Sequence, residues 1–345
     1  MTDQPLLEVR NLRKYFNQNQ SFTDTLLGRD PDSVQAVDDV SFTLHERESK
    51  GIIGESGCGK TTLLMVLLGL QDRTDGEILF KGEEISAYNK RQWREFRSNV
   101  QVIFQDPFDS LDPKMSVREV LEIPLDVHGM DEKDARIRET LSQVELNPPE
   151  RYLGRLPKQL SGGEKQRVAI ARALVVEPDI VMADEPVSML DVSTQASILR
   201  LLSRLRDEMD LSLLYISHDL STVGYICDDI NVMYLGRIVE TAPTMDILDD
   251  PKHPYTAELI NAIPIPDPHH DRSRTQLEGS TPDPINIGEG CRFRERCPER
   301  MEICERTPVV VEEDSSTVAC HLYYEHEEHD GDVAAARDSS EVARR

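Results

Sequence analysis

The hydrophobic positions of this 345-residue chain form short runs that polar segments separate. Alternating or β-branched runs predict strands, and apolar positions repeating about every 3.6 residues predict helices. The predicted strands cover residues 6–16, 34–44, 50–53, 76–82, 100–104, 180–185 and 212–217. The predicted helices cover residues 62–68, 89–98, 116–146, 168–175 and 192–208. Asn147-Pro148-Pro149 ends the third helical stretch, because proline cannot continue a helix.

The amino-acid composition of the chain changes after Asp249. Prolines become frequent, and residues 267–284 are polar, which predicts a boundary followed by a linker-like arm. From Tyr324 onward small and charged residues predict disorder. We therefore expect one large domain over 1–249, an extension over 250–323 and a disordered tail over 324–345.

Composition narrows the function. The formal net charge is −25 at pH 7, from 39 basic and 64 acidic residues, which argues against binding of nucleic acid. An acidic chain poor in lysine is typical of a cytoplasm of high ionic strength, as in salt-loving organisms, and an ordinary solvated acidic surface is the alternative. The chain has no run of about 18 apolar residues and no basic, apolar leader, so we expect a cytosolic protein, free or docked on a membrane protein.

Residues 54–61 read Gly-Glu-Ser-Gly-Cys-Gly-Lys-Thr and fit the phosphate-binding pattern G-x-x-x-x-G-K-[ST] without a mismatch. A predicted strand precedes them and a predicted apolar helix follows, which is the context that the motif requires. Glycines let backbone N–H groups approach a phosphate, and a helix N-terminus adds partial positive charge. Lys60 is expected to reach the β- and γ-phosphates, and the Thr61 hydroxyl to bind Mg²⁺.

Two adjacent carboxylates end the predicted strand 180–185. Ligands bind at the carboxyl ends of strands in parallel α/β sheets. Asp184 is expected to hold Mg²⁺, directly or through water, and Glu185 to orient or deprotonate an attacking water. His218 follows the strand 212–217 at the same edge, which favours a contact with a γ-phosphate over a purely structural role.

Two further stretches carry weaker signals. Ser161, Gly162 and Gly163 precede an apolar helix and predict a helix N-terminus that faces an anion, although such a triplet alone is usually a cap. The strand 6–16 ends in two aromatic residues, and an aromatic side chain there can stack on adenine. Phe16 is the first candidate and Tyr15 the second, with an ordinary strand-end aromatic as the alternative.

The six cysteines divide into two groups. Cys58 lies in the phosphate loop and Cys227 in a predicted helix, whereas four cluster near the C-terminus: Cys291, Cys297, Cys304 and Cys320. A cytosolic protein rarely keeps disulfides, so the cluster indicates a metal or chance. The spacing lacks the close pairs of zinc ribbons. Four thiolates can hold an iron–sulfur cluster, while zinc with His321 as a spare ligand and an unliganded cluster are the alternatives.

Together and in this order, these motifs resemble the ATP-binding subunits of ABC transporters. The resemblance covers about residues 6–249 and rests on the phosphate loop, Gln105, the Leu-Ser-Gly-Gly signature at 160–163, the Asp184–Glu185 strand, Asp191 and His218. It implies an α/β fold of the phosphate-loop type, with a RecA-like core, a small antiparallel β part and a helical subdomain over about 107–160. Lys50 departs from the pattern, because such strands usually carry an apolar residue there, and its charge is expected to weaken the strand start.

The resemblance implies a role for each matching residue. It implies ATP binding by Phe16 or Tyr15 and by Gly54, Glu55, Ser56, Gly57, Cys58, Gly59, Lys60, Thr61 and Thr62. It implies catalytic roles for Glu185, His218 and Gln105, and Mg²⁺ ligation by Thr61, Gln105 and Asp184. In the family two subunits close head to tail, so the signature residues Leu160, Ser161, Gly162, Gly163 and Glu164 would contact ATP on the other subunit, with Asp191 in the D-loop.

A finer resemblance is to the ATPases of oligopeptide and dipeptide importers. The phrases "GESGCGK", "FQDPFDSLDPKMSV", "DEPVSMLDVS", "HPYT" and "GCRFRERCPERMEIC" look like that subfamily, and the residues 14–16 and Cys58 resemble its F-type subunit. This implies ATP hydrolysis that powers peptide import at the cytoplasmic face of the cell membrane, and a [4Fe–4S] centre at the four cysteines. The implied partners are a second ATPase subunit or a second copy, two membrane permeases and an extracytoplasmic substrate-binding protein.

Several other functions are alternatives to peptide import, and the sequence disfavours some of them. An importer of nickel or sugars in the same family is the nearest alternative. An exporter ATPase is disfavoured by the proline-rich, cysteine-bearing C-terminus, and a soluble ABC ATPase of DNA repair or translation by the single, strongly acidic cassette. A phosphate-loop kinase or GTPase would lack the signature and His218. The transported solute is not encoded in a recognisable motif of this chain.

Overall fold

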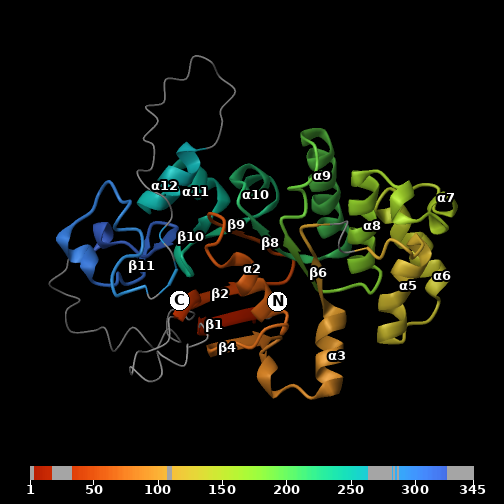
Figure 1. Ribbon diagram of the computed structural model, residues 1–345, viewed down its shortest axis with the longest axis horizontal. Coiled ribbons are helices and arrows are strands. Elements are labelled where there is room, and N and C mark those ends of the chain that lie inside the picture. Colours follow the sequence, from red (N-terminus) through yellow and green to blue (C-terminus); the bar gives the residue numbers. More distant parts are fainter. Residues whose placement is uncertain are drawn as a thin grey trace, which may run out of the picture.

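The computed structural model describes residues 4–17, 33–106, 111–262, 282, 284, 285 and 287–324. The described strands form two sheets with helices around them, in agreement with the predicted α/β class (Figure 1). The strands are β1 Leu7–Asn17, β2 Ser33–Leu44, β3 Ser49–Ile53, β4 Asp75–Phe80, β5 Glu83–Glu84, β6 Val100–Ile103, β7 Ile180–Asp184, β8 Ser212–Ser217, β9 Asp229–Tyr234, β10 Arg237–Pro243, β11 Val311–Glu313 and β12 Ser316–Val318. The α-helices are α2 Lys60–Leu67, α3 Lys90–Asn99, α5 Val117–His128, α6 Lys133–Gln143, α7 Glu150–Leu153, α8 Gly162–Leu174, α9 Val192–Met209, α10 Leu220–Ile226, α11 Thr244–Asp249 and α12 Pro254–Asn261.

The larger sheet brings the motif-bearing strands side by side. Its strand order is β11-β12-β10-β9-β3-β8-β7-β6, and the strands from β9 to β6 run parallel. Every residue of β3, β7 and β8 is buried, as expected for parallel strands covered on both faces. The carboxyl ends of β3, β8, β7 and β6 therefore meet at one edge. That edge carries the phosphate loop, His218, Asp184 with Glu185, and Gln105.

The smaller sheet, in the order β2-β1-β4-β5, is antiparallel and lies below the larger one in Figure 1. Helix α2 is placed against it, since Leu63 and Leu64 of α2 share one hydrophobic cluster with Leu7 of β1 and Ile216 of β8. A second cluster joins the helices from α5 to α12 to the other face of the larger sheet. Helix α2, which follows the phosphate loop, therefore packs between the smaller and the larger sheet, and this packing holds the loop in place.

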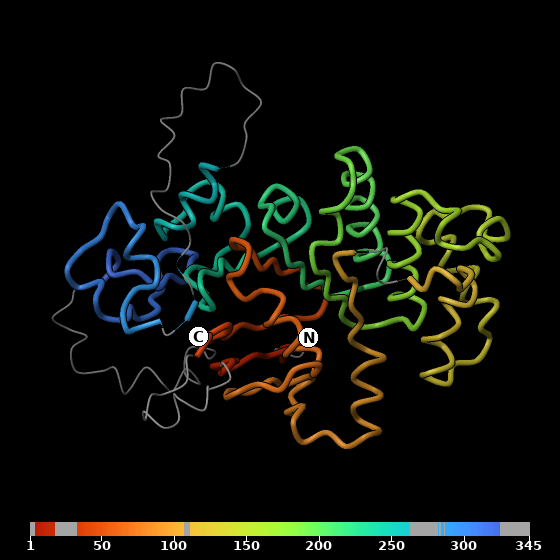
Figure 2. Tube along the Cα trace, in the orientation of Figure 1, coloured from red at the N-terminus to blue at the C-terminus, as the bar shows by residue number. Residues whose placement is uncertain are grey.

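The stretch 116–146 differs from its prediction as one continuous helical pattern. Helix α5 ends at His128, where Gly129 takes a φ of 69°, and α6 begins only at Lys133. Glycine in this left-handed conformation ends helices, because residues with a Cβ adopt it at a cost. Helices α5 to α7 lie within the predicted helical subdomain, at the opposite end of the molecule from residues 287–324 (Figure 2). The first residues of that subdomain, 107–110, lie outside the described residues.

Two expectations about single residues are wrong. Cys227 does not lie in a helix: it follows α10 and takes an extended backbone conformation. Lys50 does not weaken β3, which is intact around it. Its buried Nζ lies 2.9 Å from Oε1 of Glu48 and 4.0 Å from Oδ2 of Asp229. These carboxylates offset the desolvation of the ammonium group, so the strand accepts a lysine at this position.

The C-terminal part continues the larger sheet. Strand β12 pairs antiparallel with β10, with Glu240 opposite Val318, and β11 pairs with β12. The predicted polar arm over 267–284 lies outside the described residues except at 282 and 284, and the predicted tail lies outside them from residue 325 onward. None of the helices in the described part of the chain has the length and apolar character needed to cross a bilayer.

Candidate functional site

A pocket of about 740 Å³ lies at the edge of the larger sheet where the motif-bearing strands end. Its lining includes residues 54–62, Gln105, Glu185 and His218, together with Phe16. The remaining lining residues are Val34, Gln35, Ala36, Leu235, Gly236, Leu259 and Pro284. The structure therefore brings together, in one pocket, candidate residues that the sequence spreads over more than half of the chain.

The phosphate loop, residues 54–59, needs glycine at both ends. A Cβ at Gly54 would lie 2.1 Å from the carbonyl oxygen of Met233, and a Cβ at Gly59, whose φ is 108°, would lie 2.0 Å from that of Ala36. Helix α2 begins at Lys60, whose buried Nζ donates to the carbonyl oxygens of Gly54 (2.6 Å) and Glu55 (2.9 Å). The ammonium group lies within the loop, so a backbone cradle and a cation face the same space. This arrangement fits a phosphate group.

Thr61 and Asp184 form a pair of oxygen donors beside the loop. The Thr61 hydroxyl donates to Oδ2 of Asp184 at 3.3 Å. Burial raises the pKa of Asp184, while the hydrogen bond from Thr61 and the charge of Lys60 act in the opposite direction. A hydroxyl and a carboxylate are ligands that Mg²⁺ prefers, so these two residues fit a magnesium ion bound together with nucleotide phosphates.

Glu185 is held between two polar side chains. Its Oε1 lies 2.7 Å from Nδ1 of His218, and its Oε2 accepts a hydrogen bond from Nε2 of Gln105 at 2.9 Å. The backbone of Glu185 has a φ of 45°, and its N–H donates to the carbonyl oxygen of Ile216 at 2.8 Å. Such a conformation persists only where the surroundings impose it and is frequent at active sites. The carboxylate is therefore fixed at the pocket wall, where it can accept a proton from water.

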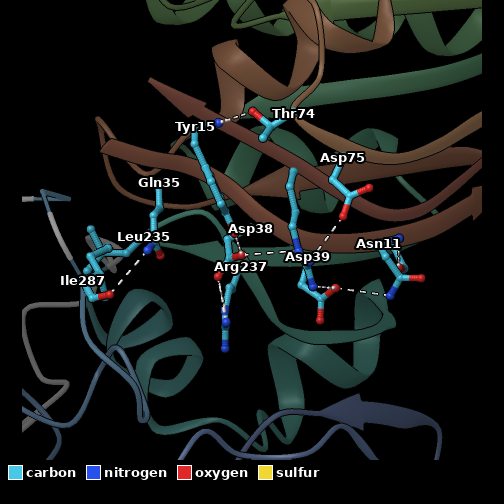
Figure 3. Close-up of polar contacts among 12 residues, drawn as sticks. Asn11, Tyr15, Gln35, Asp38, Asp39, Thr74, Asp75, Leu235, Arg237 and Ile287 are labelled. Atoms are coloured by element: carbon cyan, nitrogen blue, oxygen red, sulfur yellow. Dashed lines mark hydrogen bonds and ion pairs between the residues drawn. The ribbon is translucent and has the colours of Figure 1, made fainter. Parts of the chain in front are cut away.

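The two aromatic candidates for adenine stacking lie in different surroundings. Phe16 lines the pocket and is 38% exposed. The Tyr15 hydroxyl donates to Asp38, and the Tyr15 N–H donates to Oγ1 of Thr74 at 2.9 Å (Figure 3). Burial, together with the bond to Asp38, raises the pKa of Tyr15 to about 12. Of the two candidates, Phe16 is the one that the pocket geometry favours.

The signature residues and Asp191 lie away from the pocket. Ser161 caps α8: its hydroxyl accepts from the Glu164 N–H at 3.2 Å, and the Glu164 carboxylate accepts from the Ser161 N–H at 2.7 Å. None of residues 160–164, all of which the structure describes, is among the residues that line the pocket. Asp191 caps α9, and its bonds with Ser193 and Thr194 lower its pKa to about 2. If these residues contact ATP, that ATP must therefore be bound outside this pocket.

The four C-terminal cysteines are free thiols. Burial raises the pKa of Cys297 and of Cys320 to about 11. Among the residues that the structure describes, no group of three or more His, Cys, Asp or Glu side chains is arranged to hold a metal ion. His321, which the sequence offers as a spare zinc ligand, has its Nε2 2.9 Å from the Arg306 carbonyl oxygen and its Nδ1 2.6 Å from the Tyr324 hydroxyl. The structure therefore gives no support to the iron–sulfur or the zinc expectation.

Some pocket residues escaped sequence reasoning. Gln35, Leu235 and Gly236 form part of the wall, and no local pattern marks them. Two more residues act on the loop from the C-terminal part: the Tyr255 hydroxyl accepts from the Glu55 N–H, and Arg296 pairs with the Glu55 carboxylate. Both lie in the phrases "HPYT" and "GCRFRERC", which mark the subfamily but assign no role to single residues.

Two protein families match this chain. The family described as "ABC transporter" matches residues 37–188, and the one described as "Oligopeptide/dipeptide transporter, C-terminal region" matches residues 239–304. The chain is 42% identical over 326 residues to the oligopeptide transport ATP-binding protein AppF of Bacillus subtilis, which covers 92% of this chain and 97% of the relative. It is also 42% identical over 323 residues to the oligopeptide transport ATP-binding protein OppF of Haemophilus influenzae, covering 91% and 96%.

Solved structures of similar shape are also ATP-binding cassettes. One is cbiO1 from Clostridium perfringens, part of the ABC transporter complex cbiONQ, with a TM-score of 0.60, 26% identity and coverage of 71% of this chain and 91% of that one. Another is the ATP-binding cassette MJ0796 in a dimeric post-hydrolysis state bound to ADP and Pi, with a TM-score of 0.58, 27% identity and coverage of 69% and 98%.

Proposed function

This chain belongs to the ABC transporter family and is an ATP hydrolase, and we propose that it powers the import of oligopeptides or dipeptides through a membrane transporter. One observation carries the proposal: the match to the oligopeptide and dipeptide transporters includes the C-terminal region, residues 239–304, as well as the ATPase part. The relatives AppF and OppF, which are named for oligopeptide transport, align over more than nine-tenths of this chain. We also propose that this chain is the F-type ATPase subunit of such a transporter.

The nucleotide binds in the 740 Å³ pocket, with its phosphates on the backbone of residues 54–60 and its base against Phe16. Lys60 neutralises phosphate charge from within the loop. Thr61 and Asp184, with Gln105, would hold Mg²⁺, which would supply Lewis-acid polarisation of the phosphate oxygens. The buried position of Asp184 supports this role, because burial raises its pKa despite Thr61 and Lys60, and a bound cation would stabilise the charged carboxylate.

Glu185 orients the attacking water and accepts its proton. The Gln105 amide and the His218 ring, which bond opposite oxygens of this carboxylate, fix its direction. His218 also lines the pocket, so its ring can contact the γ-phosphate of a nucleotide bound there. These roles follow from geometry around one carboxylate, and each can be removed by a single substitution.

The signature residues act on a second nucleotide-binding chain. They form the N-terminus of α8 outside the pocket of their own chain, where the helix dipole suits an anion. We therefore include in the proposal a second ATPase subunit, either a different chain or a second copy. Two membrane permeases and an extracytoplasmic substrate-binding protein complete the assembly, with this chain at the cytoplasmic face of the cell membrane.

The iron–sulfur centre is not part of this mechanism. The described thiols form no metal-holding group, so no step depends on one. Anaerobic purification followed by iron and acid-labile sulfide analysis tests the expectation directly. Equal amounts of bound iron and sulfide would restore it, and a colourless, metal-free protein would remove both metal alternatives.

Uptake and co-purification together test the proposed function. Cells whose only copy carries Glu185→Gln are expected to lose uptake of labelled oligopeptides and dipeptides, while uptake of an unrelated amino acid is unchanged. The wild-type chain is expected to co-purify from native membranes with two permeases, an ATPase partner and a peptide-binding protein. Retained peptide uptake with lost nickel or sugar uptake would reassign the solute, and absence of permeases would contradict transport.

A further inference from the structure

The C-terminal part of the chain holds the phosphate loop directly. We define the cysteine segment as residues 287–324, which contain the four clustered cysteines. Within it, Nη1 and Nη2 of Arg296 donate to Oε2 and Oε1 of Glu55, both at 2.9 Å. We propose that Arg296 is a positioning residue for ATP binding: by holding Glu55, it keeps the phosphate loop in the shape that receives nucleotide phosphates.

The contact has the geometry of a strong ion pair. A guanidinium and a carboxylate that form two parallel hydrogen bonds fix orientation as well as distance. The Arg296 side chain is 7% exposed and that of Glu55 is 23% exposed, so solvent screens the pair less than it screens surface pairs. Arg296 also donates to the Tyr234 hydroxyl at 3.3 Å and lies over the Tyr234 ring. These contacts restrict the Arg296 side chain independently of Glu55.

A second residue outside the ATPase motifs holds the same position. The hydroxyl of Tyr255 accepts a hydrogen bond from the Glu55 N–H at 2.9 Å. The Tyr255 ring is buried and lies 4.6 Å from the Tyr234 ring and 5.4 Å from the Phe293 ring, measured between centroids. His253 caps α12 by accepting from the Tyr255 N–H at 3.0 Å. Residues 253–256, the "HPYT" phrase, therefore start α12 in a way that directs the Tyr255 side chain to the phosphate loop.

Glu55 links these contacts to Lys60, the lysine of the phosphate loop. Its carbonyl oxygen accepts from Nζ of Lys60 at 2.9 Å, while its carboxylate is held by Arg296 and its N–H by Tyr255. Movement of Glu55 therefore moves one of the two carbonyl oxygens that locate the Lys60 ammonium group. Loss of Arg296 would remove both of its hydrogen bonds to the Glu55 carboxylate and loosen the position of Lys60, although Arg296 itself does not line the pocket.

The cysteine segment is attached to the pocket at a second point. Arg292, four residues before Arg296, donates to Asp38, to Gln35 and to the Leu235 carbonyl oxygen. Gln35 and Leu235 line the pocket, and Asp38 also binds Tyr15 and Arg237 (Figure 3). Burial and the nearby Arg237 charge lower the pKa of Arg292 to about 10, against the effect of Asp38. The turn between Cys291 and Cys297 is thus anchored at two points, Arg292 and Arg296.

A role in stability alone makes a different prediction from a positioning role. A purely structural ion pair would lower the unfolding temperature when removed, yet leave the ATP affinity of the folded protein unchanged. A positioning pair would change the affinity, and the two partners would act through each other. The inference rests on nucleotide binding by this pocket and is independent of the transported solute.

The test measures the affinity of the purified full-length chain for a non-hydrolysable ATP analogue with Mg²⁺ by titration calorimetry. Arg296→Gln and Glu55→Gln are each expected to weaken binding about tenfold, and the double variant to be no weaker than either single one, as for two groups that share one interaction. Arg300→Gln is the matched control. It removes an arginine of the same segment that pairs with Glu295 and Glu305 and not with the ATPase part, so its affinity should equal that of the wild type.

Thermal unfolding without nucleotide establishes that each variant is folded. A folded Arg296→Gln chain with wild-type affinity would overturn the proposal, as would losses that multiply in the double variant. If Arg296→Gln does not fold, Arg296→Lys replaces it, because lysine keeps one charged contact. Arg296→Lys should then lose less affinity than Glu55→Gln, and wild-type affinity in both variants would overturn the proposal. Failure of the wild-type chain to bind the analogue would instead contradict ATP binding itself.

Discussion

The Nδ1 atom of His218 lies 2.7 Å from Oε1 of Glu185, which joins the ends of the neighbouring parallel strands β8 and β7. Both strands are buried throughout, so the two side chains project from a rigid support. Gln105 completes the arrangement from the next strand, β6, at 2.9 Å from the other oxygen of Glu185. The position of the carboxylate is therefore set by sheet register and not by a flexible loop alone.

Replacing Glu185 by Gln should separate binding from hydrolysis. Glutamine keeps the shape and can still bond Gln105 and His218, but it cannot accept a proton from water. We expect ATP affinity near that of the wild type and a kcat lower by about 10²–10⁴-fold. Phosphate release by the purified subunit, or by the assembled transporter, measures the effect. Turnover at the wild-type rate would remove Glu185 from the role of general base.

Replacing Lys60 by Ala should remove tight ATP binding. The substitution deletes the ammonium group that bonds the carbonyl oxygens of Gly54 and Glu55 inside the loop. Charge-assisted bonds of this kind are worth about 1.5–3 kcal/mol, so we expect affinity to fall by roughly ten- to a hundredfold. Calorimetric titration measures it, with the exposed Lys90→Ala as a control for loss of one positive charge. Unchanged affinity of Lys60→Ala would contradict the phosphate-loop assignment.

Phe16 and Tyr15 form a matched pair of variants. Phe16→Ala removes a ring that lines the pocket, and since stacking on a base is worth about 1–3 kcal/mol, ATP affinity should fall by roughly five- to a hundredfold. Tyr15→Phe removes the hydroxyl that bonds the buried Asp38. It should lower the free energy of unfolding by about 1–3 kcal/mol and leave affinity unchanged. The opposite pattern, with affinity lost in Tyr15→Phe only, would exchange the two roles.

His253 should make the chain less stable in mild acid. Burial lowers the pKa of this 1%-exposed histidine to about 3, whereas an unfolded histidine titrates near about 6.5. Below about pH 6.5 the unfolded chain therefore binds a proton that the folded chain does not. The stabilisation is complete above that pH and is lost as the pH falls toward 3. Between pH 7 and pH 5 this group should remove about 2 kcal/mol from the free energy of unfolding.

The control for this pH effect is His253→Asn. Asparagine can still accept the Tyr255 N–H as a helix cap but does not titrate, so the variant should lose about 2 kcal/mol less than the wild type between the two pH values. Urea unfolding at pH 7 and pH 5 gives both differences. Equal losses in the two proteins would show that His253 is not the group responsible.

Much of the site follows from local sequence because its residues stand at strand ends. The strand 212–217 is predicted with the bounds that β8 has, and the strands predicted at 50–53 and 180–185 are close to β3 and β7. Once these strands are parallel, Lys60, Glu185 and His218 must meet at one edge. The break between α5 and α6 was missed because apolar spacing continues across Gly129, whose backbone conformation no periodicity encodes.

The contacts made by the C-terminal part could not be predicted in the same way. Arg296 and Glu55 are 241 positions apart, and Tyr255 and Glu55 are 200 apart. Neither pair belongs to a pattern within one segment, since each depends on how the cysteine segment and α12 pack on the larger sheet. Strands β9 to β12 were likewise not assigned from sequence. The clustering of the four cysteines predicts a metal site, but their packing gives no metal-holding arrangement.

The pairing of β12 with β10 has a practical meaning for anyone who shortens or recombines this protein. A chain ending at residue 262 would leave the outer backbone groups of β10 uncovered, and exposed strand edges recruit other chains into aggregates. It would also remove Phe293, which packs on the Tyr234 and Tyr255 rings, and leave an apolar cavity in its place. Hybrids that exchange C-terminal parts between relatives should therefore carry β10, β11 and β12 from the same parent.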